Sequence, residues 1–320
     1  MLEELKMLDT VDLRFSQDGL LILNITIAFI MFGVALGIKF KHFANVFKDP
    51  RSVIVGFLSQ FLLLPALTFA IVVAFRNYLT PTVGLGMILV ASCPGGNISN
   101  FMSSLSKGNA ALSVSLTAIA TIGAVVLTPL NFAIWGGWFT NIYQSADASG
   151  LVRPLEIDPV EMFKAVLILL GIPLVLGMSF NKKFPLTADR ILKPMQILSI
   201  ILFLGMVFIM FRNNYDFFLR YIKFILIIVL LHNGLAFLTG YSIATLTRRS
   251  RYDRRAITIE TGIQNSGLGL VLLFNPKIFP VDLELGGMAF ITAWWGIWHI
   301  LSGLSLAGTL SFIPLKEKKV

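Results

Sequence analysis

Long apolar segments separated by short polar stretches dominate the pattern of this chain. Nine such segments are close to the roughly 20 residues that an α-helix needs to cross a bilayer core. Their predicted bounds are Leu20–Ile38, Val53–Phe75, Val83–Leu105, Ala110–Trp135, Val160–Met178, Met195–Phe211, Tyr221–Leu246, Ala256–Phe274 and Leu285–Phe312. The pattern predicts an all-α polytopic membrane protein of nine transmembrane helices, with residues 1–320 forming a single transmembrane domain.

Two of these segments, the third and the eighth, are interrupted by polar residues and glycines. The third contains Pro94-Gly95-Gly96-Asn97-Ile98-Ser99-Asn100, and the eighth contains Ile259-Glu260-Thr261-Gly262-Ile263-Gln264-Asn265-Ser266-Gly267. An ionisable side chain at membrane depth, such as Glu260, is costly and marks a functional site by default. Interrupted segments at corresponding positions in the two halves of a chain indicate the binding site of a transporter.

The order of the segments predicts two inverted repeats. Segments two to four and seven to nine each contain a polar stretch, then an interrupted segment, then a long segment rich in small residues. The polar stretches are Ser59-Gln60-Phe61 and Leu231-His232-Asn233-Gly234. Corresponding segments lie five apart, and an odd offset reverses their orientation in the membrane. We therefore expect the two broken helices to cross near the bilayer midplane.

Composition and charge refine this picture. Because 56% of the residues are hydrophobic and only 13% are charged, a soluble protein is excluded. The net charge of +9 would suggest a nucleic-acid partner in a soluble chain, but here basic cytoplasmic loops explain it. If the N-terminus is outside, the outer loop Gly137–Asp158 is acidic, with Asp147, Glu156 and Asp158 against Arg153. The inner loops then hold basic residues, which include Lys41, Lys48, Arg190, Lys193, the Arg248–Arg255 cluster, Lys316, Lys318 and Lys319. We expect a multi-pass protein of the cell (inner) membrane with a cytoplasmic C-terminus.

The polar side chains of the interrupted segments are rich in oxygen. Glu260 and Gln264 share one helical face, as do Ser113 and Thr117 in the fourth segment. Oxygen ligands without thiolate or imidazole suit a hard cation, and a single carboxylate among neutral oxygens suits a monovalent one. Sodium is favoured, although a lone carboxylate can also take up a proton. Taken alone, Ser113 and Thr117 could instead bond back to carbonyls of their own helix.

Five motifs occur together in this chain. They are Pro94-Gly95-Gly96-x-x-Ser99-Asn100, Gly108-Asn109-x-Ala111-Leu112-Ser113, Leu231-His232-Asn233-Gly234, Glu260-x-Gly262-x-Gln264-Asn265-Ser266-Gly267 and Trp298-His299-x-x-Ser302-Gly303. Together they resemble the bile acid:sodium symporter family, from about Leu20 to the end of the ninth segment. The resemblance implies sodium-coupled symport of an organic anion by alternating access, and no enzymatic activity. Nine helices match the animal carriers of that family, whereas Asn97 stands where a threonine is common.

The resemblance also implies roles for individual residues. One sodium site would use Ser99, Asn100, Ser113, Thr117 and Glu260, and the other would use Gln60, Glu260, Thr261, Ile263 and Gln264. A bile acid-like anion, or a smaller carboxylate or sulfonate, would contact Asn97, Asn265 and His299. This substrate would lie between a panel domain (helices at about 20–38, 160–178 and 195–211) and a core domain (about 53–135 and 221–312).

The resemblance implies no cofactor beyond sodium as the coupling ion. The expected partners are the organic anion, sodium and the lipid bilayer, with no nucleic acid and no obligate protein partner. Three other interpretations stay open. His299 could be a hydrogen-bonded core residue, the carrier could use protons, or the chain could be a sodium-responsive sensor or channel. An intramembrane hydrolase using Glu260 with His232 or His299 is a further class, but no His-Glu-x-x-His motif or nucleophile elbow supports it.

Overall fold

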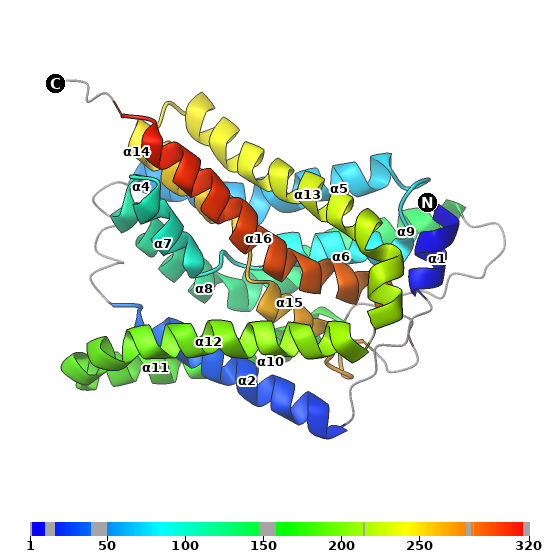
Figure 1. The fold of residues 1–320 in the computed structure, drawn as a ribbon, viewed down its shortest axis with the longest axis horizontal. Helices are drawn as coiled ribbons and strands as arrows, with labels where there is room; N and C mark the ends of the chain where they lie inside the picture. The colour runs from blue at the N-terminus through cyan, green and yellow to red at the C-terminus, as the bar shows by residue number, and fades with distance from the viewer. Residues whose placement is uncertain are drawn as a thin grey trace.

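The computed structural model describes residues 2–9, 17–39, 50–146, 158–213, 215–279, 283 and 285–315, and they form a bundle of helices (Figure 1). In chain order the helices, with η for π-helical turns, are α1 (Leu2–Asp9), α2 (Gln17–Leu36), α4 (Pro50–Leu58), η1 (Ser59–Leu63), α5 (Leu64–Ala74), α6 (Pro81–Ser92), α7 (Ile98–Leu105), α8 (Ala110–Asn131), η2 (Phe132–Gly136), α9 (Gly137–Ala146), α10 (Pro159–Val166), η3 (Leu167–Gly171), α11 (Ile172–Lys183), α12 (Pro185–Asn213), α13 (Tyr215–Leu246), α14 (Arg251–Gly262), α15 (Ser266–Leu273) and α16 (Gly286–Phe312). The chain is an all-helical, polytopic membrane protein, and five helical stretches of its described part are long and apolar enough to cross a bilayer.

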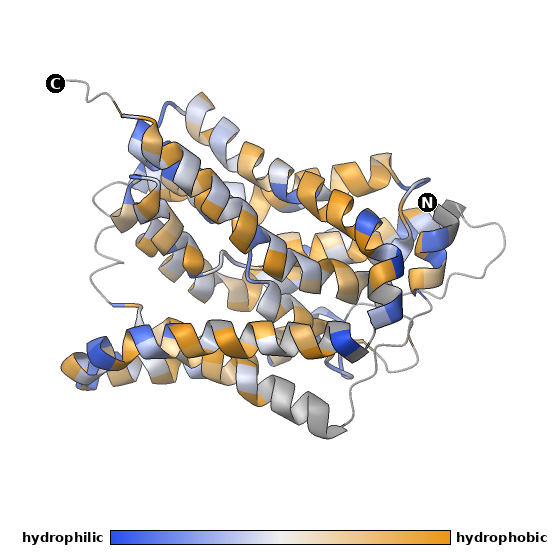
Figure 2. Cartoon of the chain, viewed as in Figure 1, coloured by the Kyte–Doolittle hydropathy of each residue, from blue (hydrophilic) through white to orange (hydrophobic). Residues whose placement is uncertain are grey.

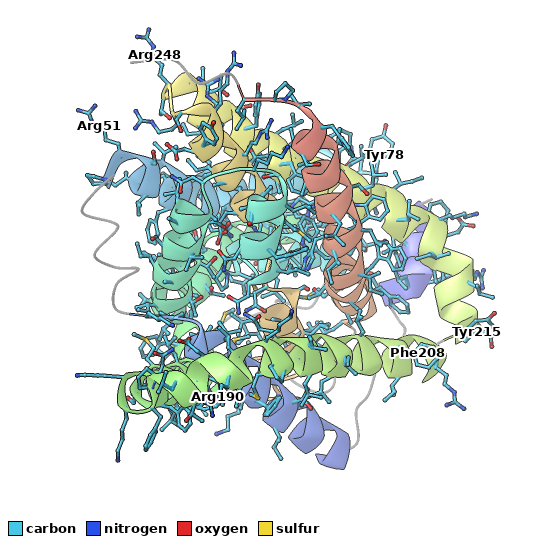
Figure 3. The ribbon with its side chains drawn as sticks, turned by 60° about the vertical axis from the view of Figure 1, so that its left-hand side comes forward. Arg51, Tyr78, Arg190, Phe208, Tyr215 and Arg248 are labelled. Carbon is cyan, nitrogen blue, oxygen red and sulfur yellow. The ribbon has the colours of Figure 1, made fainter. Side chains whose placement is uncertain are left out.

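The outer surface of the bundle is apolar along its length and polar toward its ends. Large side chains such as Leu62, Ile168 and Leu231 are exposed on the long helices, where a lipid phase would cover them. Figure 2 shows hydrophilic residues gathered toward the helix ends. In Figure 3, Arg51 and Arg248 lie toward one end of the molecule and Tyr215 toward the other. The surface therefore has the polarity of a membrane-embedded protein.

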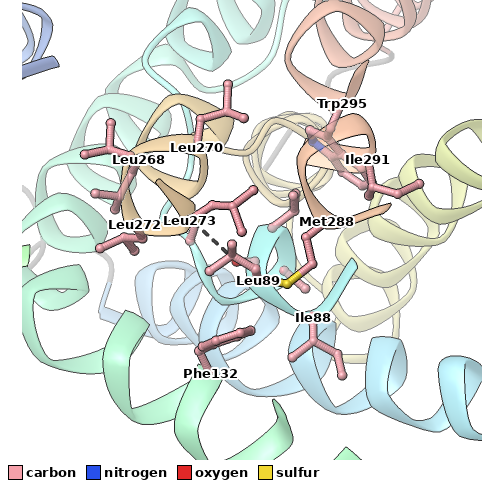
Figure 4. Packing of buried hydrophobic residues seen from close by; sticks show 14 of the residues in the cluster. Ile88, Leu89, Phe132, Leu268, Leu270, Leu272, Leu273, Met288, Ile291 and Trp295 are labelled. Carbon is pink, nitrogen blue, oxygen red and sulfur yellow. Dashed lines mark hydrogen bonds between the residues drawn. The ribbon is translucent and has the colours of Figure 1, made fainter. Parts of the chain in front are cut away.

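Buried apolar side chains of α6, α15 and α16 form the centre of the bundle (Figure 4). Every residue of α15 from Leu268 to Leu273 is buried, as expected of a helix that is apolar on all sides. Leu89 of α6 lies beside Met288 of α16 in Figure 4, and Ile88 and Ile291 belong to the same cluster. This packing fixes the first half of the third segment and the second half of the eighth segment relative to the long final helix.

Helices α2, α11 and α12 pack on one another and lie together at one side of the bundle in Figure 1. The contact between α2 and α11 is close at Gly177, where an added Cβ would lie 2.5 Å from the Ala35 Cβ. Small residues at such crossings let two helix backbones approach, which is how membrane helices gain packing energy without a hydrophobic driving force. Of these three helices, α2 and α12 line the cavity described below.

Two predicted loops are helical in the structure. The predicted outer loop from residue 137 to residue 158 is wrong in its first part, because α9 continues to Ala146. Phe139 is buried there, and the Tyr143 hydroxyl donates to the carbonyls of Arg76 and Leu79, each at 2.7 Å. The predicted loop containing Arg190 and Lys193 is wrong as well, because α12 begins at Pro185, a favoured first residue of a helix.

Several predictions fall outside the described residues. They concern the basic residues and the acidic-loop residues Lys41, Lys48, Asp147, Arg153, Glu156, Lys316, Lys318 and Lys319. The N-terminal helix α1 was not among the predicted segments. It packs through Leu5 and Leu8, and its Asp9 carboxylate accepts hydrogen bonds from the hydroxyls of Thr80 and Thr82 at the start of α6.

A π-helical turn, η1, interrupts the second segment just before Pro65. Proline has no N–H, so it cannot donate to the carbonyl four residues earlier, that of Phe61. The Asn131 side chain of α8 donates to this carbonyl instead, with Nδ2 2.9 Å from the Phe61 oxygen. A buried carbonyl at membrane depth needs such a partner, so Asn131 compensates for Pro65. The wider turn also carries Gln60, whose side chain is buried in the site described next.

We expect Asn131→Ala to destabilise the protein by roughly 1–3 kcal/mol, because it leaves the buried Phe61 carbonyl unsatisfied. The cost should be smaller in a Pro65→Ala background, where residue 65 can donate to Phe61. Thermal melting of the purified protein in detergent measures all four members of this cycle. Trp135→Phe is the control, since it removes only the other hydrogen bond of Asn131, from the indole Nε1 at 3.1 Å. Equal losses in both backgrounds would contradict the assignment.

Candidate functional site

The two interrupted segments meet at their breaks. Residues 93–97 separate α6 from α7, and residues 263–265 separate α14 from α15. The Gly96 N–H donates to the Ile263 carbonyl and the Asn265 N–H donates to the Pro94 carbonyl, both at 2.8 Å. Gly95 and Gln264 are paired as an isolated antiparallel bridge. Backbone that leaves a helix inside a membrane must find new hydrogen bonds, and each break supplies them to the other.

A side chain from the preceding segment completes each break. The Gln60 Nε2 donates to the Cys93 carbonyl at the end of α6, at 2.9 Å. The Asn233 Nδ2 of α13 donates to the Gly262 carbonyl at the end of α14, at 2.7 Å. The last carbonyls of a helix have no intrahelical donor, so an amide at each position stabilises the interruption. The two breaks are thus built by the same chemistry.

Four polar residues surround the Glu260 carboxylate, and together with it they form the Glu260 cluster, which consists of Ser99, Asn100, Ser113, Thr117 and Glu260. Glu260 is 3% exposed. Its Oε2 accepts hydrogen bonds from the hydroxyls of Ser99 at 2.6 Å and Ser113 at 3.0 Å. Its Oε1 accepts one from the Thr117 hydroxyl at 2.6 Å. Residues from α7, α8 and α14 therefore converge on a single buried acid.

The Glu260 cluster has more acceptor oxygens than protons to share. The Ser113 hydroxyl, with one proton, lies 3.0 Å from both Glu260 Oε2 and Asn100 Oδ1. The single Thr117 proton faces three acceptors, at 2.6 Å (Glu260), 3.1 Å (the Ser113 carbonyl) and 3.2 Å (Asn100). No Lys or Arg of the described residues forms an ion pair with Glu260. Such a carboxylate requires a bound cation or a proton to offset its charge.

A second group of buried amides lies beside the break, and we call Gln60, Thr261 and Gln264 the Gln60 cluster. The Gln60 Nε2 donates to Gln264 Oε1 at 2.8 Å, and the Gln264 Nε2 donates to the Thr261 carbonyl at 2.7 Å. Because Gln60 Nε2 is fixed by two acceptors, Gln60 Oε1 must point elsewhere. This oxygen is buried without a hydrogen-bond partner among the described residues. An unsatisfied buried oxygen is a place where a cation can bind.

A cavity of about 730 Å³ opens beside the crossing, between the breaks, α2, α12 and α16. All three predicted substrate contacts, Asn97, Asn265 and His299, line it. Both breaks turn the first residues of their second helices, α7 and α15, toward the cavity, and helix N-termini attract anions. The α2 wall is apolar and consists of Ile27, Ile30, Met31 and Val34. The cavity can accept an anion that has an apolar body.

The structure brings most of the predicted site residues together. The five members of the first predicted sodium site are in direct contact, whereas the second set is only partly assembled. Both Glu260 oxygens accept hydrogen bonds inside the Glu260 cluster, and the Ile263 carbonyl accepts one from Gly96. The sequence analysis missed the Lys193, Gln196 and Ser199 wall of the cavity. Their spacing of three residues is the available signal, but a charged residue just before an apolar segment, such as Lys193, predicts a loop.

Comparison with known proteins identifies relatives along most of the chain. The model of the "Sodium Bile acid symporter family" matches residues 24–220. An uncharacterized sodium-dependent transporter of Bacillus subtilis is 31% identical over 285 residues, which are 89% of this chain and 81% of that protein. A probable chloroplastic sodium/metabolite cotransporter of Oryza sativa subsp. japonica is 31% identical over 288 residues, 85% of this chain but only 63% of its own length. A sodium-dependent organic anion transporter of Bos taurus is 27% identical over 321 residues, 99% of this chain and 78% of that protein.

Gly95 allows the closest approach between the two breaks. A Cβ at this position would lie 2.8 Å from the Glu260 Oε1, so Gly95→Ala should displace the carboxylate and lower the melting temperature in detergent by several degrees. Gly234→Ala in α13 is the matched control, because its Cβ would meet nothing within 4 Å. Equal melting temperatures for the two variants would show that the Glu260 cluster tolerates the displacement.

Proposed function

The chain belongs to the sodium bile acid symporter family, and we propose that it couples inward sodium flow to the uptake of an organic anion by alternating access. Membership in this family makes it a membrane transporter and not an enzyme. The observation that carries the proposal is the Glu260 cluster, in which neutral oxygens surround a buried carboxylate that pairs with no Lys or Arg of the described residues. Sodium is a hard cation that prefers oxygen ligands, and one negative charge matches its single positive charge.

The first proposed sodium site is the Glu260 cluster itself. Sodium bound there would be held by oxygens of Ser99, Asn100, Ser113, Thr117 and Glu260, and it would resolve the shortage of protons between them. The ligands come from α7, α8 and α14, so the ion would join the second half of one interrupted segment to the first half of the other. A proton on Glu260 is the competing coupling ion, and it would leave the oxygens of Asn100 and Ser113 competing for the same donors.

The second proposed sodium site lies at the Gln60 cluster. The free Gln60 Oε1 supports it, together with backbone oxygens of Thr261 and Ile263, the Gln264 side chain and the neighbouring Glu260. Glu260 would be shared by the two ions, which gives a physical route to cooperativity. Sodium at the first site orders the break that the second ion binds, so the second ion loses less conformational entropy on binding.

The organic anion would occupy the 730 Å³ cavity, with its charged group at the starts of α7 and α15. Asn97 is free to contact it, because its side chain does not cap α7, whereas the Asn265 side chain accepts from the Leu268 N–H and caps α15. His299 is 6% exposed, and its Nδ1 has no hydrogen-bond partner among the described residues, which favours a substrate contact over a satisfied core residue. The size of the cavity suits a bile acid-like anion as well as a smaller carboxylate or sulfonate.

The proposed architecture has nine transmembrane helices in two inverted repeats. The matching chemistry of the breaks supports the repeats, since Gln60 and Asn233 occupy corresponding places in segments two and seven. The packing of α2, α11 and α12 at one side of the bundle supports a panel domain beside a core domain. Arg51 and Arg248 lie toward the same end of the molecule in Figure 3. This supports an orientation in the cell membrane with the N-terminus outside and the C-terminus in the cytoplasm.

The affinity for sodium should fall when Thr117 is replaced but not when Thr121, one helical turn away, is replaced. Thr117→Val removes the 2.6 Å hydroxyl contact with Glu260, whereas Thr121→Val removes only a bond to the Thr117 carbonyl on the same helix, at 2.7 Å. We expect the sodium concentration needed for half-maximal stabilisation to rise about tenfold in Thr117→Val and to stay unchanged in Thr121→Val. Thermal melting in sodium against choline measures this. If the melting temperature depends on pH through Thr117 and does not depend on sodium, the coupling ion is a proton.

Cooperativity should depend on Gln60. In proteoliposomes with an imposed sodium gradient, we expect sodium-driven uptake of a transported anion to rise with a Hill coefficient above one. Gln60→Met keeps the length of the side chain and removes its oxygen, so the coefficient should fall toward one. Thr121→Val is the control that keeps both proposed sites. A Gln60→Met protein that is folded and retains the wild-type coefficient would remove Gln60 from the sodium sites.

A further inference from the structure

The α12 wall of the cavity carries a row of polar side chains. Lys193, Gln196 and Ser199 are spaced three residues apart, so they lie on one face of the helix, and all three line the cavity. The neighbouring wall of α2 contributes only apolar residues and a glycine. Lys193 and Gln196 are exposed and Ser199 is half-buried, so this polar row is accessible to a ligand that enters the cavity.

Lys193 is the only side chain with a formal charge among the described residues that line the cavity. The carboxylate best placed to pair with it along α12 is Asp189, four residues earlier. Asp189 instead accepts from the Lys39 Nζ at 2.5 Å. Across the described part of the chain, no carboxylate pairs with Lys193. Its ammonium group is therefore available to a ligand in the cavity.

A second region that favours anions lies at the crossing, and we call this region and Lys193 the two poles of the cavity. The starts of α7 and α15 reach the cavity there, and His299, nine-tenths buried, has an Nδ1 without a partner among the described residues. These groups come from the breaks and α16, whereas Lys193 comes from α12. The same cavity thus has two separate places that favour negative charge, with the apolar side chains Ile27, Ile30 and Val34 on the wall of α2.

We propose that the transported substrate is a dianion, with two acidic groups joined by an apolar body. One group binds at the helix starts by the crossing, and the other binds Lys193 and Gln196. A monoanion at the crossing leaves the Lys193 ammonium without a counter-charge as the filled cavity loses water, which weakens binding. The inference rests on the proposed function, because it assigns the substrate class of that same cavity.

Suberate and monomethyl suberate test this proposal, since the ester keeps the shape of the molecule and removes one charge. Binding to the purified full chain in sodium is measured by calorimetry and by thermal melting, and adipate with its monomethyl ester tests the span between the poles. We expect the wild type to bind a diacid about tenfold more tightly than its ester. Ester binding as tight as diacid binding, or no binding of either diacid, would overturn the proposal.

Three variants distinguish a direct contact between Lys193 and the ligand from a general effect of positive charge on binding. Lys193→Gln should weaken binding of the diacid about tenfold and leave binding of the ester unchanged, whereas Lys193→Arg should keep the preference. Arg190→Gln is the matched control, because Arg190 lies on the same helix, is exposed and does not line the cavity. A diacid preference that survives Lys193→Gln, or that Arg190→Gln removes equally, would overturn the assignment.

One further variant and a comparison of sodium with choline show whether a failed test contradicts the dianion assignment or the proposed function. Asn265→Ala alters the crossing, so it should weaken binding of the diacid and binding of the ester by the same factor. Thermal melting in sodium and in choline, with and without ligand, tests the proposed sodium coupling. If sodium does not stabilise the wild type with or without ligand, then sodium coupling fails. If sodium stabilises it and the diacid preference is absent, only the dianion assignment fails.

Discussion

The burial of one carboxylate inside a membrane domain is the constraint on which this structure depends. Glu260 is 3% exposed and is held by hydroxyls from α7 and α8. Its position is possible only because two helices are broken beside it. Gly95 brings the first break against the carboxylate, and the backbone bonds between Gly96 and Ile263 and between Pro94 and Asn265 hold the breaks together. A continuous helix in either segment would remove these bonds and the start of a second helix at the cavity.

This arrangement gives a physical basis for coupling between cation and anion. The Glu260 cluster and the cavity share the same short backbone segments, since Asn100 and Gln264 line the cavity while Gln264 also belongs to the Gln60 cluster. In the proposed mechanism, a cation that orders the breaks also fixes the starts of α7 and α15, where the anion binds. Each ligand therefore increases the affinity for the other, as thermodynamic linkage requires. Alternating access would follow from movement of the α2, α11 and α12 group relative to this site.

Sequence reasoning identified the chemistry of the site better than the helix bounds. A carboxylate and carboxamides inside apolar segments are rare enough to mark Glu260, Gln264 and Asn100 without a structure. Helix ends set by tertiary contacts were not predictable in this way. The sequence of α9 is typical of a loop, but its Tyr143 hydroxyl is held by backbone carbonyls that lie 64 and 67 residues earlier in the chain. A charged residue next to an apolar segment usually marks the end of a transmembrane helix, so the sequence predicts a loop at Lys193. In the structure Lys193 lies within α12 and lines the cavity.

Infrared difference spectroscopy tests most directly whether Glu260 binds the coupling cation. Exchange of choline for sodium around the purified protein should shift the carboxylate stretching bands of one buried acid, and Glu260→Gln should abolish that shift. If sodium leaves the carboxylate bands unchanged, or if the same difference spectrum persists in Glu260→Gln, then the buried acid is not a sodium ligand and the account of coupling fails.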